Sequence, residues 1–184
     1  MSRFQRPIML AILVLTGIAL SEIAFSVWSA RALTNFPRHL VMPVRGASIS
    51  NMRDTFDETR GTNRKHEATD ILAPQGTPVV AADDGVIKKL FLSKPGGLTI
   101  YQFDPTEQYA YYYAHLDRYA EGIHEGTKVH RGDVIAYVGS TGNASPNEPH
   151  LHFGIFVLGP EKRWWEGTPI NPYPILMSSE NVKL

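Results

Sequence analysis

No cysteine occurs among the 184 residues, and this excludes a disulfide scaffold, a thiolate zinc finger, a cysteine protease and a lipid anchor on cysteine. The chain also has no net charge, because 18 Lys and Arg balance 18 Asp and Glu, so its charge does not favour nucleic acid as a partner. Aromatic residues are plentiful, with eight Phe, eight Tyr and three Trp, and this excludes intrinsic disorder. The length fits one domain with a sizeable core.

An apolar run, IMLAILVLTGIAL, occupies residues 8–20, and Arg3 and Arg6 precede it. Apolar residues resume after a short polar break, so residues 8–30 together are long enough to cross a bilayer, which needs about 20 residues. We therefore expect residues 1–30 to form a hydrophobic helix that is either a signal sequence or a transmembrane anchor. The protein would be exported, and would be either anchored in the inner membrane facing the periplasm or periplasmic or secreted after cleavage.

Long amphipathic helices are also lacking, because no stretch after residue 40 sustains an apolar period of 3.6 residues. Short apolar and β-branched runs occur instead, separated by Gly, Pro and Asp. They lie at 77–81, 86–92, 98–103, 108–115, 134–138 and 150–158. This spacing predicts an all-β sandwich or barrel. A faint repeat, Gly-Thr-x-Val at Gly76 and again at Gly126, indicates two similar hairpin units folded against each other.

Two polar clusters contain metal-binding residue types. The first, His66-Glu67-Ala68-Thr69-Asp70, is followed at once by Pro74 and Gly76, which argues against a helical H-E-x-x-H zinc motif. In an extended segment, even spacing places His66 and Asp70 on one face and Glu67 on the other. Strand alternation in the second cluster likewise turns His150 and His152 to the same side, with Leu151 between them.

The third cluster is Tyr109-Ala-Tyr-Tyr-Tyr-Ala-His115, where the same alternation places Tyr109, Tyr111, Tyr113 and His115 on one face. The tyrosines line a substrate groove or, as we favour for at least two of them, are ordinary cross-strand packing.

Catalytic zinc takes three ligands from His and carboxylate and keeps an open position, while a further His suits proton transfer near neutral pH. Two His and one Asp as ligands, with two more His as acid–base groups, would complete such a site. Alternation does not tell which of His150 and His152 is the ligand. The remaining histidines, His39, His124 and His130, do not belong to such a cluster. They are expected to be exposed to solvent or to have a packing role.

These motifs resemble the lysostaphin/LytM-type zinc metallopeptidases, which cleave peptides of the bacterial cell wall. The resemblance runs from about Arg60 to Val157, with a similar tail at residues 170–172. It is carried by RKHEATDI, APQGTPV, AADDGVI, YAHL, VGSTGN and PHLHFG, which occur in this order. One departure is Ala68, where the family usually has Gly, and this change removes no ligand.

The resemblance implies a two-sheet β-roll or barrel-like sandwich built on a duplicated motif, and it implies one Zn²⁺ per chain. It makes His66, Asp70 and His152 the metal ligands, with His115 and His150 as the catalytic residues that act on water and the transition state. Arg60, Arg64 and Tyr113 are candidates for a further group that stabilises the oxyanion. The domain organisation expected is residues 1–30 as the hydrophobic segment, 31–60 as a connector, 61–160 as the metallopeptidase domain and 161–184 as a tail that packs on it.

The predicted function is therefore a zinc endopeptidase that hydrolyses peptide cross-links of peptidoglycan, with the membrane contacted through the N-terminal segment. The alternative is a non-catalytic wall-binding activator of other hydrolases, and the complete ligand set argues against it. A lipoyl-type or biotinyl-type carrier would show its modified lysine at a hairpin tip, whereas Lys88 and Lys89 lie inside a predicted strand. A metal-storage protein would prefer a closed coordination shell. The pair Trp164-Trp165 contacts membrane or wall polymer, or covers the end of the barrel.

Overall fold

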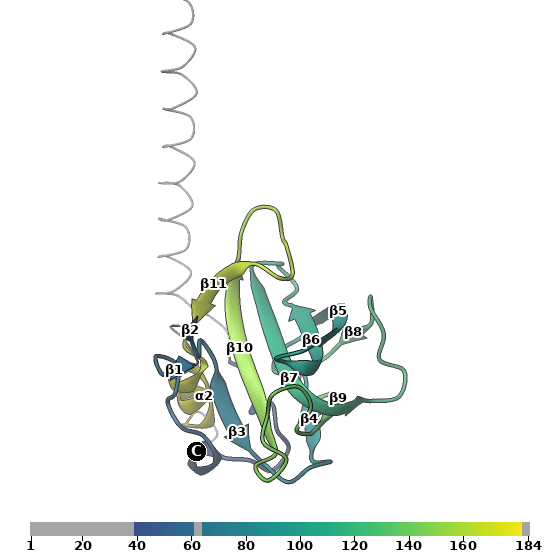
Figure 1. Cartoon of the computed structure of the whole chain (residues 1–184). Helices are drawn as coiled ribbons and strands as arrows, with labels where there is room; N and C mark the ends of the chain where they lie inside the picture. The colour runs from purple at the N-terminus through teal and green to yellow at the C-terminus, as the bar shows by residue number, and fades with distance from the viewer. Residues whose placement is uncertain (1–38, 61–63, 182–184) are drawn as a thin grey trace, which may run out of the picture. The chain divides into compact units, whose positions relative to one another are not determined.

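The computed structural model describes residues 39–60 and 64–181, and in this part of the chain most regular structure is β-strand (Figure 1). The expected hydrophobic segment at residues 1–30 lies outside the described residues. The elements are η1 (Ile49–Asn51), β1 (Thr59–Arg60), β2 (Arg64–Lys65), β3 (Thr69–Leu72), β4 (Pro78–Val80), β5 (Gly85–Ser93), β6 (Gly97–Phe103), β7 (Tyr109–Tyr119), β8 (Lys128–Val129), β9 (Val134–Val138), β10 (His150–Leu158), β11 (Gly167–Ile170) and α2 (Pro172–Asn181).

Nine of the described strands form one sheet, and every described strand pair is antiparallel, which agrees with the predicted all-β class. The main order is β11-β10-β7-β6-β5-β8, with β3 added to β10, and β9 joined to both β7 and β4. Strands β1 and β2 pair separately as a small hairpin. The long strands β10 and β7 lie at the centre of the sheet, so side chains on their free face share one surface.

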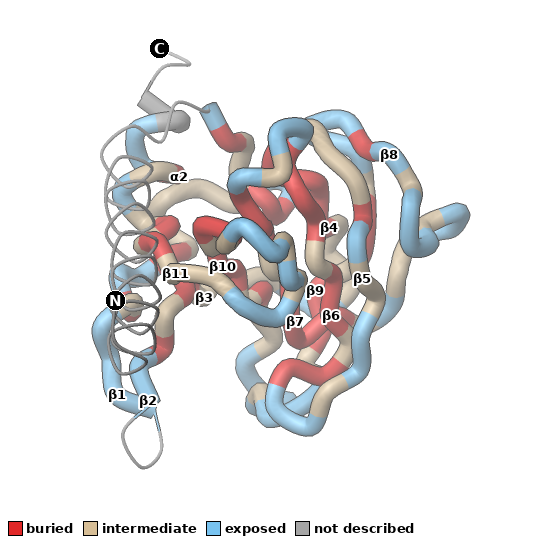
Figure 2. The backbone as a smooth tube through the Cα atoms, turned by 90° about the horizontal axis from the view of Figure 1, so that it is seen from above, coloured by how far each residue is buried: buried red, intermediate tan, exposed pale blue. Residues whose placement is uncertain are grey.

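Strand β10 shows why the sequence forms this sheet. Leu151, Phe153, Ile155 and Val157 are fully buried, while the histidines between them are only partly covered. One face of the strand therefore packs into the core, which Figure 2 shows in red along the strands, and the other face remains available for a site.

A polar network lies inside this core. The Tyr113 hydroxyl donates to Gln102 Oε1 at 2.7 Å and accepts the Ala82 N–H at 2.9 Å. Gln102 Nε2 donates to the Asp83 carbonyl at 2.7 Å, and the Tyr111 hydroxyl donates to the Asp83 carboxylate at 2.9 Å. Burial raises the pKa of both tyrosines above the ordinary value, so they remain neutral donors. The network satisfies polar groups that would otherwise destabilise the core.

The two similar units predicted from the sequence pair with each other through their strands. Strand β4 of the first unit pairs with β9 of the second, and β5 of the first pairs with β8 of the second. The units are folded against each other as expected, but their pairing runs between the units and not within each one.

The expectation that no substantial helix follows residue 40 is wrong at the C-terminal end, where α2 spans Pro172–Asn181. Asn171 caps this helix, because its side-chain oxygen accepts the Tyr173 N–H at 2.9 Å, and Pro172 suits the first helical position. Leu176 is buried and fixes the helix to the domain. The helix has too few turns to give a sustained period in the sequence. Among the described helices, none has the length and apolar character needed to cross a membrane.

The residues before β1 pack on the sheet. Leu40, Val44 and Met52 are buried, and isolated bridges join Val44 to Val79 and Met52 to Ile71. This segment carries Arg53 and Thr55 to the edge of the groove described next.

Candidate active site

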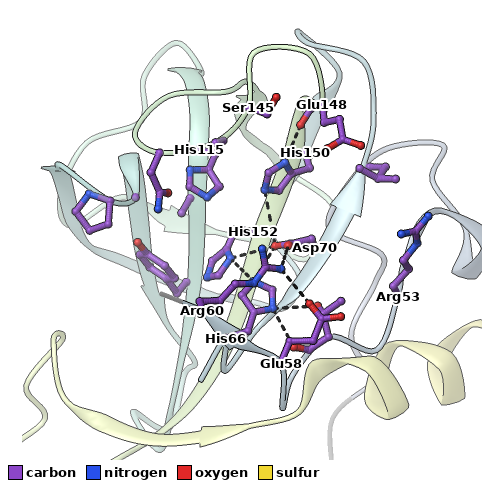
Figure 3. Close-up of a pocket in the computed structure, with 18 of the residues that line it drawn as sticks. Arg53, Glu58, Arg60, His66, Asp70, His115, Ser145, Glu148, His150 and His152 are labelled. Atoms are coloured by element: carbon purple, nitrogen blue, oxygen red, sulfur yellow. Dashed lines mark hydrogen bonds and ion pairs between the residues drawn. The ribbon is translucent and has the colours of Figure 1, made fainter. Parts of the chain in front are cut away.

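Three donor atoms meet in a groove of about 540 Å³ on the free face of the sheet (Figure 3). Asp70 lies on β3 and His152 on β10, where the two residues are direct cross-strand partners. The Nδ1 atom of His152 lies 3.1 Å from Asp70 Oδ1, and His66 Nε2 lies 3.0 Å from His152 Nδ1 and 3.1 Å from Asp70 Oδ1. The three atoms form a nearly equilateral triangle, which is a candidate metal site.

The donor set fits a zinc ion. Three ligands about 2.0–2.1 Å from a tetrahedral metal lie roughly 3.3 Å apart, close to the separations seen here. Two imidazole nitrogens and one carboxylate oxygen are a typical catalytic ligand set, and three ligands leave a coordination position open.

His66 is oriented by the segment that precedes β1. Its Nδ1 lies 2.9 Å from Thr55 Oγ1 and 3.2 Å from the Thr55 carbonyl oxygen. When Nε2 binds a metal, Nδ1 carries the proton and donates to these oxygens, so Thr55 fixes both the tautomer and the ring. The His66 side chain is almost fully buried, which restricts the ring to this orientation.

The expected extended segment from His66 to Asp70 is only partly present. Strand β3 begins at Thr69, and Glu67 has a φ of 55°, in the left-handed region. This turn, and not strand alternation, brings His66 beside Asp70. Ala68, which replaces the usual glycine, is buried without a positive φ, so alanine is accommodated there.

The Asp70 carboxyl is held in its ionised form. Burial works to raise the pKa of its carboxyl, but hydrogen bonds from His152 and His66 outweigh burial and hold that pKa well below its ordinary value. Its second oxygen, Oδ2, accepts from Arg60 Nη2 at 3.0 Å, which leaves Oδ1 facing the histidines. Arg60 also lies 3.5 Å from Glu58, so this guanidinium joins two carboxylates at the edge of the groove.

His150 enters the groove from the same strand face as His152, as the alternation predicts. Its Nδ1–H donates to the Glu148 carbonyl at 2.8 Å, which directs Nε2 into the groove, where it lies 3.8 Å from Asp70 Oδ1. His150 is therefore held beside the donor triangle without belonging to it.

His115 reaches the groove because β7 contains a bulge. The pairing steps from Ile100–Tyr113 to Leu98–Leu116, so β7 has one residue more than β6, and His115 has a φ of 59°. Its ring centroid lies 5.0 Å from that of His150 and 5.6 Å from that of His152. The prediction that His115 shares a face with Tyr109, Tyr111 and Tyr113 is wrong, because the bulge turns it to the opposite side.

The His115 Nδ1–H donates to the Thr141 carbonyl at 2.8 Å, so Nε2 faces the groove. Burial, together with nearby His152 and His150, lowers the pKa of His115 to about 4, against the raising effect of Thr141 and Asp70. The imidazole is therefore neutral at pH 7, and its Nε2 accepts a proton.

Thr141 anchors the loop between β9 and β10 beside His115. Its hydroxyl donates to the Leu116 carbonyl at 2.7 Å and accepts the Leu98 N–H at 3.0 Å. Two glycines allow this approach, since a Cβ on Gly142 would lie 2.4 Å from Gly97 N, and one on Gly97 would lie 2.2 Å from Thr141 Oγ1. Both have a positive φ, so the position of the loop depends on glycine at each.

Of the two roles considered for Tyr109, Tyr111 and Tyr113, the structure supports cross-strand packing, which we favoured for at least two of them. Tyr109, Tyr111 and Tyr113 are buried in the core, so Tyr113 is excluded as a group that contacts the oxyanion. The groove is lined by Tyr112 instead, which the alternation assigned to the other face. Arg60 and Arg64 both line the groove and remain candidates for that role.

Other groove residues gave no signal in the sequence. Arg53, Ser145 and Glu148 belong to loops that only the fold brings together (Figure 3). His39, His124 and His130 are exposed, and none of them lines the groove, in keeping with the solvated role expected.

The chain is similar to known proteins both in sequence and in fold. The model of Peptidase family M23 matches residues 64–172. The L-Ala–D-Glu endopeptidase of Bacillus subtilis (strain 168) is 36% identical over 149 residues, which cover 77% of this chain and 44% of that protein. The chain spans less than half the length of this and the next curated relatives it matches.

Two solved structures are similar in fold. The lytM protein of Ruminococcus gnavus ATCC 29149 has a TM-score of 0.60 and 35% identity over 71% of this chain and 54% of that chain. The catalytic domain of the antimicrobial peptidase lysostaphin from Staphylococcus simulans has a TM-score of 0.59 and 27% identity over 71% of this chain and 98% of that chain. The match to the family model covers both the donor triangle and the two further histidines, and on this basis the chain belongs to Peptidase family M23.

Proposed function

We propose that the chain is a zinc-dependent endopeptidase that hydrolyses peptide bonds in bacterial cell-wall peptidoglycan. The observation that carries this proposal is the donor triangle of His66, Asp70 and His152 at the floor of an open groove, with the imidazoles of His115 and His150 beside it. The activities printed for the relatives, such as the L-Ala–D-Glu endopeptidase, support a peptidoglycan peptide as the substrate.

His66, Asp70 and His152 would hold one zinc ion per chain. When bound, zinc supplies a Lewis acid that polarises a scissile carbonyl and lowers the pKa of water toward neutrality. The remaining chemistry falls to this chain's own side chains.

His115 and His150 are the proposed catalytic residues. Each donates its Nδ1–H to a backbone carbonyl, so each turns its Nε2 toward the groove. One Nε2 accepts a proton from the attacking water, and the resulting imidazolium donates a hydrogen bond to the developing oxyanion before it passes this proton to the leaving amine. The other Nε2 accepts a hydrogen bond from the same water and so orients it for attack. Carbonyl partners on Thr141 and Glu148 keep both rings in orientation throughout.

The proposed domain organisation follows the sequence. Residues 1–30 serve as a signal sequence or membrane anchor, so that the protein works outside the cytoplasm. Residues 31–60 connect this segment to the metallopeptidase domain at 61–160, a two-sheet β-roll with a duplicated motif, and 161–184 form its tail. The exchanged pairing of β4 with β9 and of β5 with β8 supports the duplication.

The test is to incubate the full zinc-loaded chain with purified peptidoglycan and to identify the released muropeptides by mass. Loss of cross-linked dimers with the parent protein, but not with His152→Ala, supports an endopeptidase and identifies the bond. A zinc-loaded parent that leaves every cross-link intact, yet raises the rate of a second wall hydrolase, would replace this proposal with the activator role.

A further inference from the structure

A row of aromatic rings leads away from the donor triangle along the groove face of the sheet. Ring centroids are 5.9 Å apart between His152 and Tyr112, 4.6 Å between Tyr112 and Tyr101, and 4.9 Å between Tyr101 and Trp164. Trp164 in turn lies 5.3 Å from Phe91 and 5.3 Å from Trp165. We call Tyr112, Tyr101, Trp164, Phe91 and Trp165 the aromatic ladder.

The register of the strands explains why the ladder lies on the groove face. Tyr112 pairs with Tyr101 on β6 and with Gly154 on β10, and Gly154 is two residues from His152 on the same face of β10. Gly154 has no side chain, so the ring of Phe156 fills the space beside Tyr112. The ladder is therefore continuous with the floor of the groove at Tyr112.

The far end of the ladder is exposed, with Phe91 in β5 and the two tryptophans on the loop between β10 and β11. Trp165 is 62% exposed and Phe91 is 40% exposed, which is unusual for side chains of this size. Trp164 packs on a small core of Phe103, Ala110 and Leu158. Lys162 Nζ donates to the Glu107 carbonyl at 2.6 Å, and this contact ties the loop to the start of β7. The tryptophans are thus presented on a loop that is already ordered.

The surroundings of the ladder carry little net charge. Lys88 is paired with Glu107 at 2.7 Å, Lys89 with Glu125 at 2.8 Å and Arg163 with Glu166 at 3.1 Å. Lys94, in the turn between β5 and β6, adds an exposed positive charge, while Lys162 and the neighbouring Glu161 add one charge of each sign. Anionic lipid or an acidic polymer would be attracted by a cluster of unpaired cations, which this surface does not offer.

The exposed apolar side chains also do not form one membrane-binding patch. Leu92 is 68% exposed, but it follows Phe91 directly in β5 and so points to the opposite face of the sheet edge. On the ladder side, the exposed rings are those of Phe91 and Trp165, and both pack tilted or edge to face against Trp164. Flat rings with electron-rich faces suit the C–H faces of pyranose sugars, which are uncharged and partly apolar.

We propose that the aromatic ladder is a sugar-stacking subsite, which holds N-acetylhexosamine units of a glycan strand while the attached peptide lies at His152. This inference rests on the proposed function, since the same polymer must reach both places. Trp165 and Phe91 are the stacking platforms, and Tyr101 and Tyr112 connect them to the groove.

The test compares two substrates that share the same cross-linked peptide. One is intact peptidoglycan, and the other is the peptide dimer freed from its glycan by an amidase. The full zinc-loaded chain, Trp165→Ala and the control Leu92→Ala are assayed on both. We expect Trp165→Ala to lower kcat/KM about tenfold on the glycan-attached substrate and to leave the rate on the free peptide unchanged. Leu92→Ala, which removes an equally exposed side chain from the other face, should match the parent on both.

Each other outcome has a definite meaning. A parent that cleaves neither substrate contradicts the proposed function itself. If the parent cleaves both substrates, and Trp165→Ala either matches the parent or loses the same fraction of its rate on both, the sugar subsite is overturned and the proposed function stands. A loss that appears only when anionic phospholipid vesicles are added, and equally on both substrates, would assign Trp165 to a lipid surface and also overturn it. Direct binding is checked by tryptophan fluorescence with the tetramer of N-acetylglucosamine, which should change the emission of the parent and of Leu92→Ala but not that of Trp165→Ala.

Discussion

Replacing Tyr113 with phenylalanine should destabilise the domain without impairing its chemistry. The lost hydroxyl is fully buried, donates to Gln102 Oε1 at 2.7 Å and accepts the Ala82 N–H at 2.9 Å. Tyr113→Phe therefore leaves one acceptor and one donor buried without this partner. Each such group costs about 1–3 kcal/mol, so the free energy of unfolding should fall by about 2–6 kcal/mol. For a domain of this size that corresponds to a Tm lower by roughly 5–18 °C.

Urea unfolding followed by fluorescence measures the loss, and the cleavage rate per folded molecule is taken well below the lower Tm. The matched control is Tyr112→Phe. Tyr112 is next to Tyr113 in the chain, but its ring lies on the groove face. Loss of the Tyr112 hydroxyl should therefore change the free energy of unfolding by at most about 1 kcal/mol. If Tyr113→Phe kept the parental stability and lost activity, Tyr113 would contact the substrate, and its assignment to the core would be refuted.

The other predictions concern the donor triangle and its supports. His152→Ala should lose both bound zinc and activity, whereas His115→Ala should keep zinc and lose about 10²–10⁴ in kcat, with zinc content read by mass spectrometry; loss of zinc from His115→Ala would contradict the division of roles. Thr55→Val should weaken zinc binding about tenfold in a chelator competition, because it removes the hydroxyl that helps to orient the His66 ring and leaves only the Thr55 carbonyl, 3.2 Å from His66 Nδ1. An unchanged affinity for zinc would show that the hydroxyl does not orient the ring. Gly142→Ala should lower kcat at constant zinc content, because its Cβ would lie 2.4 Å from Pro95 O and displace the loop that holds His115; a parental kcat would mean that the loop adjusts without moving Thr141.

Much of the site could be predicted from the sequence because β10 is a regular strand. Two histidines separated by one apolar residue must share a face, and Leu151 and Phe153 are indeed buried on the other side. The gathering of His66, Asp70 and His152 was also predicted, although the resemblance and not the spacing assigned the ligand roles. The residues that escaped prediction are those placed by loops, such as Thr55 and Thr141, whose contacts join segments far apart in the chain.

His115 shows what a period of two cannot predict. Its position was predicted by counting along β7, and the count failed because the strand contains one extra residue at the bulge. A bulge with a positive φ often carries glycine, yet here a histidine takes that conformation and Ala114 precedes it, so the local sequence gives no signal. Such a backbone is unfavourable for a residue with a Cβ, and it persists only where surrounding contacts impose it. Those contacts are present: the His115 N–H donates to the Gly96 carbonyl at 2.8 Å, and the ring is fixed by Thr141. The same extra residue that moves His115 into the groove leaves Tyr113 in the core, so one local irregularity separates a proposed proton acceptor from a structural tyrosine only two residues away.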